Sequence, residues 1–388
     1  MHITRLELFD FRNYTTLRWE PLPGLNLIVG PNAQGKTNLL EAIYLLATTK
    51  SVRAGRDGEM VRFGADACRV AAEVRREQQG DVLLEIAIAS PTATNIGGER
   101  KIVKVNHGKQ ARVTDLIGHV NAVLFSSVDL DIVRGEPEDR RRFLNYEISQ
   151  VSPRYALAYG SYRRSLEQRN RLLKDIKYGQ AGLPSLETWT LQVAEHGARL
   201  IERRRAYVEK LAVHTAAMHR SLTENRETVA PEYAPSFPLA PGVVTVEEVK
   251  TAFIAALGEL RREELQRGTT LLGPQRDDLR FSVGATPETA VEVQTYGSQG
   301  QQRTTALSLR LAERQLIEEM VGEPPVVLLD DVLSDLDEYR RARIFELALS
   351  EGQTFLTTTD LAAIPPEAIA QAAIWRVAAG TVERTEAP

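Results

Sequence analysis

The chain has 388 residues, of which 43% are hydrophobic and 26% charged, and its formal net charge is −4. A chain of this length and composition has room for about two or three globular domains. The opening residues, MHITRLELFD, carry charges where a signal peptide needs an apolar run, and no stretch approaches about 18 apolar residues. We therefore expect neither secretion nor a membrane span. The single cysteine, Cys68, excludes an intrachain disulfide and a multi-cysteine metal site, so we expect a cytoplasmic protein in which Cys68 is a small core residue.

The first third of the chain shows strand and helix patterns in turn. Apolar residues alternate around Ile3, Leu6 and Leu8, and a short apolar run covers 25–29 between Pro-Gly and Gly-Pro, so both segments are predicted to be strands. A helix is expected over 38–47. Residues 1–125 are the expected first lobe.

The middle of the chain is basic and helical. Residues 131–220 contain 17 Lys and Arg against 11 Asp and Glu, a net charge of +6, which leaves −10 for the rest of the chain. From Tyr155 the apolar residues follow a 4-3-4 spacing, with Arg169 in the one missing position of the seam. A turn cluster at 179–184 and a helical pattern over 186–222 then predict a helical hairpin. The spacing could also indicate a coiled coil, but the seam lasts too few turns, and packing within a helical lobe over 126–272 is favoured. The seam tyrosines Tyr155, Tyr159 and Tyr162 are predicted to be core residues rather than base-stacking platforms.

The last part of the chain returns to an α/β pattern. The segment 230–241 holds four prolines and is predicted to be a linker. Strands are expected at 326–329, 354–358 and 374–377, separated by helical stretches. Residues 273–388 are therefore expected to complete the lobe that the N-terminal segment begins.

A phosphate-binding loop follows the second predicted strand. Gly30, four further residues, and then Gly35-Lys36-Thr37 match the P-loop pattern between a strand and a helix, which is the context that the motif requires. Its backbone N–H groups and the helix N-terminus attract anions. Lys36 is expected to reach the β- and γ-phosphates, and Thr37 to place its hydroxyl on Mg²⁺.

Two further motifs fit a nucleotide site. Asp330 and Asp331 end an apolar run, so Asp330 is expected to hold Mg²⁺ and Asp331 to act on the attacking water; the alternative is a plain strand end with a capped helix behind it. The segment 296–302, YGSQGQQ, precedes a helical stretch over 303–320. Ser298, Gly300 and the start of that helix would form a second anion-binding surface, unless the segment is only a glycine-containing helix start.

These motifs, followed by Ser334-Asp335-Leu336-Asp337, resemble the ABC-type ATPase heads of the SMC and RecF group, and the detail is most similar to the RecF family. The segments that carry this likeness are Phe11-Arg12-Asn13-Tyr14, Asn32 to Ala42, Ser51-x-Arg53, Arg140 to Leu144, Gln168-Arg169-Asn170, Gly273-Pro274-x-Arg276-Asp277-Asp278 and the 296–302 signature. The resemblance implies an α/β P-loop ATPase head with a helical second lobe and no long coiled coil.

The resemblance also implies ATP and Mg²⁺ as cofactors and an ATP-dependent homodimer, in which Ser298 and Gly300 of one copy face the γ-phosphate held by Lys36 of the other. The residues expected to be catalytic are Lys36, Asp331 and Ser298. Those expected to bind nucleotide are Arg12, Asn13, Gly30, Asn32, Gly35, Lys36, Thr37, Asn38, Ser298, Gly300, Gln301 and Asp335, with Thr37 and Asp330 on the metal. Arg12 and Asn13 could equally be exposed turn residues.

The sequence departs from the family pattern at four places. No histidine follows His219, so the switch histidine of many ABC ATPases is missing and 357–360 occupies its region. Because Asp331 is also shorter than the more usual Glu, slow hydrolysis is expected. The segment 125–130 lacks a Pro-Glu pair that the family often has, and no role is assigned to it. Gln275 stands where the family commonly has His, which weakens an acid–base role for that turn.

Two functions remain from different classes. The RecF likeness implies a weak DNA-dependent ATPase of recombinational repair that clamps duplex DNA beside single-strand gaps and helps load RecA with RecR and RecO. The alternative is the ATPase subunit of a membrane transporter, although 261 residues lie between Lys36 and Ser298, where transporter motors use a compact insertion. A metal-dependent nuclease is a weaker third option. Basic side chains suit phosphate contacts, and the DNA-binding candidates are Arg140, Arg141, Arg142, Arg163, Arg164, Arg169 and Arg171, with Lys174 and Arg203 to Arg205; any one cluster could instead be a solvated helix face.

Overall fold

The computed structural model describes residues 1–77, 80–91, 93, 100–180, 182, 184–240 and 245–385, with the side chains of Ser334 and Asp335 excepted. The chain forms two compact units. Unit 1 combines residues 1–129 with 310–388, and unit 2 is the continuous stretch 130–309. The first break lies close to the expected boundary at 125/126. The second lies at 309/310, inside a helix, rather than at 272/273, and the three-segment division by role stays a prediction.

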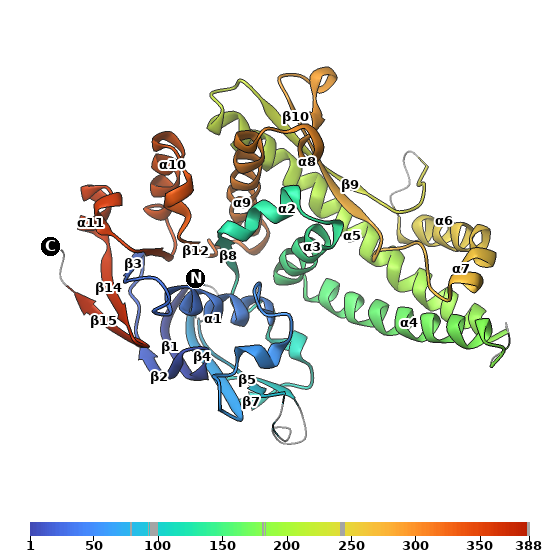
Figure 1. The fold of residues 1–388 in the computed structure, drawn as a ribbon, viewed down its shortest axis with the longest axis horizontal. Coiled ribbons are helices and arrows are strands. Elements are labelled where there is room, and N and C mark those ends of the chain that lie inside the picture. The colour runs from blue at the N-terminus through green and yellow to red at the C-terminus, as the bar shows by residue number, and fades with distance from the viewer. Residues whose placement is uncertain are drawn as a thin grey trace. The chain divides into compact units, whose positions relative to one another are not determined.

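Within the described residues, unit 1 holds two six-stranded sheets. The first is antiparallel, with the order β2-β1-β4-β5-β6-β7. Its strands (blue to cyan in Figure 1) are β1 (His2–Phe11), β2 (Tyr14–Trp19), β4 (Ala67–Arg76), β5 (Gly80–Ala89), β6 (Lys101–Val105) and β7 (Gly108–Lys109). Cys68 on β4 is buried, as expected for a core residue.

The second sheet has the order β15-β14-β3-β13-β12-β8 and is parallel except for β15. Its strands are β3 (Leu25–Val29), β8 (Ala122–Phe125), β12 (Val326–Asp330), β13 (Thr354–Thr358), β14 (Ala373–Ala378) and β15 (Thr381–Thr385). Strands β3, β12 and β13 are almost continuously buried, which explains why they appear in the sequence as apolar runs rather than as alternating patterns. The four predicted strands at 25–29, 326–329, 354–358 and 374–377 are confirmed.

The helices of unit 1 are α1 (Lys36–Thr48), α10 (Glu338–Ala348), α11 (Pro366–Gln371) and the later part of α9 (Gln299–Val321). Short 3-10 helices cover Asp57–Met60, Val113–Leu116, Ser127–Asp129, Val332–Asp335 and Leu361–Ala363. Helix α1 begins at Lys36, two residues before the predicted start. It extends no further toward the N-terminus because the preceding residue, Gly35, has a left-handed backbone conformation.

Unit 2 is mainly helical. Its helices are α2 (Leu130–Arg134), α3 (Pro137–Val151), α4 (Pro153–Lys177), α5 (Pro184–Leu222), α6 (Val246–Glu259), α7 (Arg261–Arg267), α8 (Val293–Tyr296) and the first part of α9, with a 3-10 helix at Pro287–Thr289. Ser152 caps α4, since its side chain accepts a hydrogen bond from the Tyr155 amide, and Pro153 occupies the first helical position. Helices α4 and α5 pack together as the predicted hairpin. Tyr155 and Tyr162 are buried, as the seam predicts, whereas Tyr159 is only half-buried.

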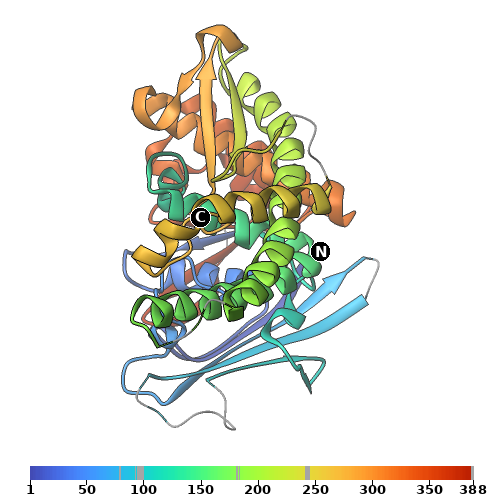
Figure 2. The same ribbon diagram turned by 90° about the vertical axis from the view of Figure 1, so that its right-hand side faces the viewer.

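The predicted linker at 230–241 is wrong in its first half. Residues Thr228–Ala234 form β9, which pairs with β10 (Asp278–Gly284), and β11 (Val291–Glu292) completes a sheet of order β11-β10-β9. The pair lies side by side in both ribbon views (Figures 1 and 2). Pro231 is tolerated because β9 is an edge strand of this sheet, where a residue without an N–H donor costs no ladder bond.

Candidate nucleotide-binding site

The phosphate-binding loop leaves the end of β3 and enters α1, all within unit 1. Gly35 has φ +112°, and a Cβ there would lie 2.5 Å from Asn13 Nδ2 and 2.8 Å from the Tyr14 hydroxyl. That hydroxyl donates a hydrogen bond to the Gly35 carbonyl, 3.1 Å away. A Cβ on Gly30 would lie 2.3 Å from the backbone oxygen of Val377 on β14. Both glycines are therefore required by contacts with neighbouring strands as well as by the loop itself.

Lys36 is held on the loop that precedes it. Its Nζ donates to the carbonyl oxygens of Gly30, at 2.7 Å, and Pro31, at 2.9 Å. Burial lowers the pKa of Lys36, and the nearby carboxylates of Asp331 and Asp330 oppose that shift only in part. The ammonium group thus lies at the mouth of the loop, where a bound phosphate would replace the two carbonyl partners.

Thr37 and Asp330 come together from opposite ends of the chain. Asp330 Oδ1 accepts hydrogen bonds from Thr37 Oγ1 and from Thr357 Oγ1 on β13, both at 2.9 Å. Burial raises the pKa of Asp330, and the two hydroxyl donors counteract it. A half-buried carboxylate beside a hydroxyl is an oxygen donor set of the kind that Mg²⁺ takes. The two residues predicted for the metal are thus adjacent.

Asp331 is exposed and has a left-handed backbone, with φ +53°, which is uncommon for a residue other than glycine. Its amide donates to Thr357 Oγ1 at 2.9 Å. Thr357 therefore bonds both aspartates: its hydroxyl donates to the Asp330 carboxylate and accepts from the Asp331 amide. The region in which the switch histidine was expected and not found contributes this threonine instead.

A cavity of about 390 Å³ lies beside these groups, lined by residues that include Thr37, Glu41, Arg53, Asp330 and Asp331. Residues 126–128, to which the sequence analysis assigned no role, also line it. They follow β8, the neighbour of β12 in the sheet, so the parallel order brings them to the same edge as Asp330. Only the sheet order places them there, and the sequence carries no local sign of it. Arg53 belongs to the Ser51-x-Arg53 segment, which carries part of the RecF likeness, although no role was predicted for this arginine.

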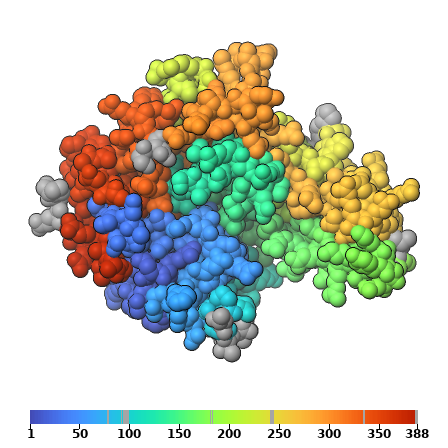
Figure 3. Space-filling view, in the orientation of Figure 1, coloured from blue at the N-terminus to red at the C-terminus, as the bar shows by residue number. Residues whose placement is uncertain are grey.

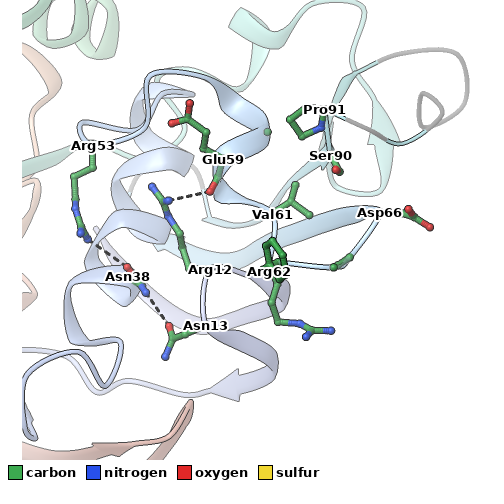
Figure 4. Close-up of a pocket in the computed structure, with 14 residues that line it drawn as sticks. Arg12, Asn13, Asn38, Arg53, Glu59, Val61, Arg62, Asp66, Ser90 and Pro91 are labelled. Carbon is green, nitrogen blue, oxygen red and sulfur yellow. Dashed lines mark hydrogen bonds between the residues drawn. The ribbon is translucent and has the colours of Figure 1, made fainter.

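A second cavity, of about 750 Å³, is lined by Arg12, Asn13, Asn38 and Arg53 among others (Figure 4). Asn38 connects them, since its Nδ2 donates to Asn13 Oδ1 at 2.8 Å and its Oδ1 accepts from Arg53 Nη1 at 3.3 Å. Asn13 in turn donates to the loop carbonyl of Gln34 at 2.9 Å. Three of the residues predicted to bind nucleotide therefore line one cavity beside the loop.

Arg12 also has a structural partner. Its guanidinium donates two hydrogen bonds, at 2.8 and 2.6 Å, to the carboxylate of Glu41, which is buried on α1. A further bond at 2.9 Å reaches the Glu59 carbonyl. Asn32 is exposed on the loop. A contact of Arg12 or Asn32 with nucleotide stays a prediction.

The signature segment lies in unit 2, at the start of α9. Ser298 and Gly300 are exposed, so the helix N-terminus is open to solvent. Ser298 Oγ accepts from the Gln301 amide at 3.2 Å, and Gln301 Oε1 accepts from the Ser298 amide at 2.9 Å. This reciprocal pair is a capping box, and it orders the open end of a 23-residue helix. Asp337 caps α10, while the side chain of Asp335 lies outside the described part of the structure.

Two of the arginines predicted to contact DNA are buried and paired with carboxylates. Arg140 is buried and bonds Asp278 through two nitrogens, at 2.7 and 3.0 Å. Arg169 is buried and bonds Glu264 at 2.6 Å. Both guanidinium groups are needed to neutralise carboxylates inside unit 2. Their partners come from segments 138 and 95 residues away, which charge counting along the sequence cannot reveal.

The remaining basic candidates are distributed differently. Arg204 is buried, and Arg141 is half-buried and donates to the Asp277 carbonyl at 2.9 Å. The exposed candidates are Arg142 on α3 and Arg163, Arg164, Arg171 and Lys174 on α4. Helix α4 (green) forms part of the surface in the space-filling view (Figure 3). Their role in binding DNA stays a prediction.

Comparison with known proteins shows the family to which this chain belongs. A family model described as the RecF/RecN/SMC N terminal domain matches residues 2–364. The DNA replication and repair protein RecF of Oceanobacillus iheyensis is 41% identical over 383 residues, which cover 98% of this chain and 100% of that protein. The chain belongs to the RecF family. The family member of Halalkalibacterium halodurans is 40% identical over 385 residues, with 99% of this chain and 100% of that protein covered.

A solved RecF structure agrees with the fold. The recombination mediator protein RecF with ATP, from the RecFOR pathway, has a TM-score of 0.89 and 31% identity, covering 99% of this chain and 97% of that one. An Smc head domain from Pyrococcus furiosus matches with a TM-score of 0.52 at 16% identity, which shows a shared fold alone. The predicted α/β ATPase head with a helical second lobe is confirmed, and the described residues form no long coiled coil.

The transporter alternative is not favoured, because the full-length relatives are DNA replication and repair proteins of the RecF family. Among the described helices, none combines the length and the apolar character needed to span a bilayer.

Proposed function

We propose that this RecF-family protein is an ATP-dependent DNA-binding protein of recombinational repair. In its ATP-bound dimer it clamps duplex DNA beside single-strand gaps and, together with RecR and RecO, assists the loading of RecA. The observation that carries the proposal is the hydrogen bond between Thr37 Oγ1 and the half-buried Asp330 carboxylate, 2.9 Å long, at the start of the phosphate-binding helix. The 31% identity to a RecF solved with ATP supports the same assignment. Because such a clamp works on chromosomal DNA, we place it in the cytoplasm.

The residues of unit 1 divide the work of binding ATP. The loop amides from Asn32 to Gly35 and the α1 N-terminus face the phosphates, and Lys36 exchanges its two carbonyl partners for phosphate oxygens. Thr37 and Asp330 hold Mg²⁺, which when bound offsets the phosphate charge. Asp331, which has a left-handed backbone directly after β12, orients the attacking water.

Hydrolysis is slow in this proposal. Thr357 occupies the region where a switch histidine was expected, and its hydroxyl already bonds Asp330 and the Asp331 amide. A threonine cannot supply the positive charge of a protonated histidine to the γ-phosphate. The ATP-bound dimer therefore persists, and DNA stimulates a weak ATPase.

The second half of the site comes from another copy of the chain. One copy contains one P-loop and one signature segment, and Ser298 with Gly300 is exposed at an ordered helix N-terminus. Such an end attracts an anion. We assign it to the γ-phosphate bound by the partner copy, which makes ATP the link between two protomers.

The test compares dimer formation and duplex-DNA binding, each with and without ATP and Mg²⁺, in the wild type and four variants. Asp331→Asn is expected to trap the ATP-bound dimer on DNA, Ser298→Arg to bind ATP but stay monomeric, and Lys36→Arg to lose ATP-driven dimerisation. Ser185→Arg, an exposed serine at the start of α5, is the matched control and should behave as the wild type. A wild type that binds ATP yet ignores DNA under all conditions would overturn the proposal.

A further inference from the structure

The signature segment is tied to the turn between α5 and β9 through one side chain. Gln301 Nε2 donates to Glu227 Oε1 at 2.7 Å, while Gln301 Oε1 accepts from the Ser298 amide at 2.9 Å. The two ends of one amide group thus face Glu227 and the signature backbone. All three residues belong to unit 2.

The chemistry of Glu227 decides which way that amide points. A carboxylate only accepts hydrogen bonds, so it can bond the NH₂ end of Gln301 and not its oxygen. The oxygen is then left on the side of Ser298, where an N–H donor is present. If the amide were reversed, its NH₂ group would face the Ser298 amide and its oxygen would face the carboxylate, which puts like groups together at both ends.

Glu227 is itself held in place before any partner arrives. Its amide donates to Thr223 Oγ1 at 3.4 Å, and its carbonyl accepts from the same hydroxyl at 3.1 Å. The turn between them is closed by the Arg226 amide on the Thr223 carbonyl at 3.0 Å, with Glu224 and Asn225 both at positive φ. The side chain of Glu227 therefore starts from a fixed backbone in the turn between α5 and β9.

A second tie lies one turn before the end of α5. The imidazole of His219 is fully buried, and its Nδ1 is 3.1 Å from Ser308 Oγ on α9. Its Nε2 lies 4.0 Å from Glu227 Oε2. His219 and Glu227 thus contact α9 at two places along its length, and these contacts fix the position of the signature helix relative to α5.

We propose that Glu227 is a positioning residue for the signature: through Gln301 it holds the Ser298 turn in the form that accepts the γ-phosphate of a partner copy. This inference rests on the proposed function. It also gives α5 a role, because this 39-residue helix packs against the basic helix α4 and ends at Leu222, five residues before Glu227. Helix α5 then connects a DNA contact on α4 with the ATP-dependent interface at the signature.

The experiment measures two quantities for the full-length chain with ATP and Mg²⁺. The first is ATP affinity at a protein concentration too low for dimers, which reports on the P-loop alone. The second is the ATP concentration that gives half-maximal dimerisation, measured by sedimentation. Glu227→Ala should leave the first unchanged and raise the second about tenfold or more, the effect of losing a hydrogen bond to a charged group. Glu227→Gln keeps an acceptor oxygen and should restore dimerisation to within about threefold.

Glu224→Ala is the matched control, since it removes an exposed carboxylate from the same turn whose recorded ion pair is with Arg226. It should match the wild type in both measurements. The inference is overturned if Glu227→Ala dimerises as the wild type does, if its monomeric ATP affinity falls in parallel, or if Glu227→Gln is as impaired as Glu227→Ala. A wild type that stays monomeric with ATP would overturn the proposed clamp itself, and the positioning role with it, which is a separate result.

Discussion

At the scale of single residues, Gly30 shows how the second sheet constrains the phosphate-binding loop. The added methyl group of Gly30→Ala would lie 2.3 Å from a backbone oxygen of β14, which cannot move without breaking the parallel pairing with β3. We expect the variant to lose about 1–3 kcal/mol of stability and to bind ATP more weakly. Thermal unfolding and an ATP titration measure the two effects.

The control for this substitution is Gly258→Ala near the end of α6, where a Cβ meets nothing within 4 Å. Alanine there should be neutral or stabilising by up to about 1 kcal/mol, because it restricts the unfolded chain and suits a helix. If Gly30→Ala unfolds at the wild-type temperature and retains full ATP affinity, the close contact with β14 does not constrain the loop.

At the scale of elements, the segment Gly273 to Asp278 turns out to be a structural junction of unit 2. Asp277 is buried and accepts hydrogen bonds from the Ser236 amide, at 2.7 Å, and from the Tyr233 hydroxyl. Arg204 of α5 lies 3.9 Å from it and donates to the Pro274 carbonyl at 2.8 Å. The junction therefore joins α5 to both strands of the β9–β10 pair.

Replacing Arg204 should destabilise this junction severely. Arg204→Met leaves Asp277 as a buried carboxylate without its cation, and we expect a loss of about 3–5 kcal/mol in unfolding free energy. Arg199→Met, on the same helix but exposed and paired only within one turn, should cost less than about 0.5 kcal/mol. Denaturant unfolding of both variants provides the measurement, and equal losses would contradict the argument.

The first sheet carries a ladder of charges whose contribution depends on pH. Glu85 on β5 pairs with Arg69 and Lys104 on the two adjacent strands, each at 2.8 Å. Burial acts to raise the pKa of Glu85, but the hydrogen bonds and charges of Arg69 and Lys104 outweigh it, so the pKa lies below its ordinary value. A depressed carboxylate pKa stabilises the fold above the unfolded-state pKa, and the stabilisation is lost as pH falls through the folded-state value.

The Glu85→Gln variant should therefore be less stable than the wild type by about 1 kcal/mol at pH 7, and the difference should shrink below about pH 4. Thermal unfolding at several pH values measures it. Glu20→Gln, which removes an exposed carboxylate from a surface pair, should show no such pH-dependent difference. A gap between Glu85→Gln and wild type that is constant from pH 7 to pH 3 would show that the charge of Glu85 is not responsible.

The sequence was sufficient where the deciding contacts are local. Loop glycines, Lys36 and Thr37 occupy one short segment between a strand and a helix, so pattern alone located them. It was insufficient where the partner is distant, as for Arg140 and Arg169, whose carboxylates come from other elements, and for Pro231, whose strand is possible only because it lies at a sheet edge. Ser126 lines the cavity because β8 is the neighbour of β12 in the sheet, and the periodicity of the sequence does not reveal strand order.

At the scale of the whole molecule, DNA binding should depend on the exposed arginines of α4. Arg163, Arg164 and Arg171 are the test set, and replacing all three with Gln should weaken ATP-dependent duplex binding and reduce the slope of log K against log salt by up to about 3, roughly one per lost phosphate contact. Dimerisation by ATP should be unchanged, since these residues lie outside the motifs. The control replaces three exposed arginines elsewhere, Arg18, Arg75 and Arg384, with Gln. An unaltered slope in the α4 variant would remove α4 from the DNA-binding surface.

The strand order of the second sheet has a consequence for how the protein is made. β3, which leads into the phosphate-binding loop, has β13 and β14 as its two neighbours, and these begin at Thr354 and Ala373. A ribosome adding about 5–20 residues per second needs roughly a quarter of a minute to a minute to proceed from β3 to these two neighbours. Unit 2, which is continuous and ends at residue 309, is synthesised before either neighbour of β3 and can begin to fold first. The nascent chain therefore completes its ATP site only after β13 and β14 have been made, later than the synthesis of the helical unit that carries the signature.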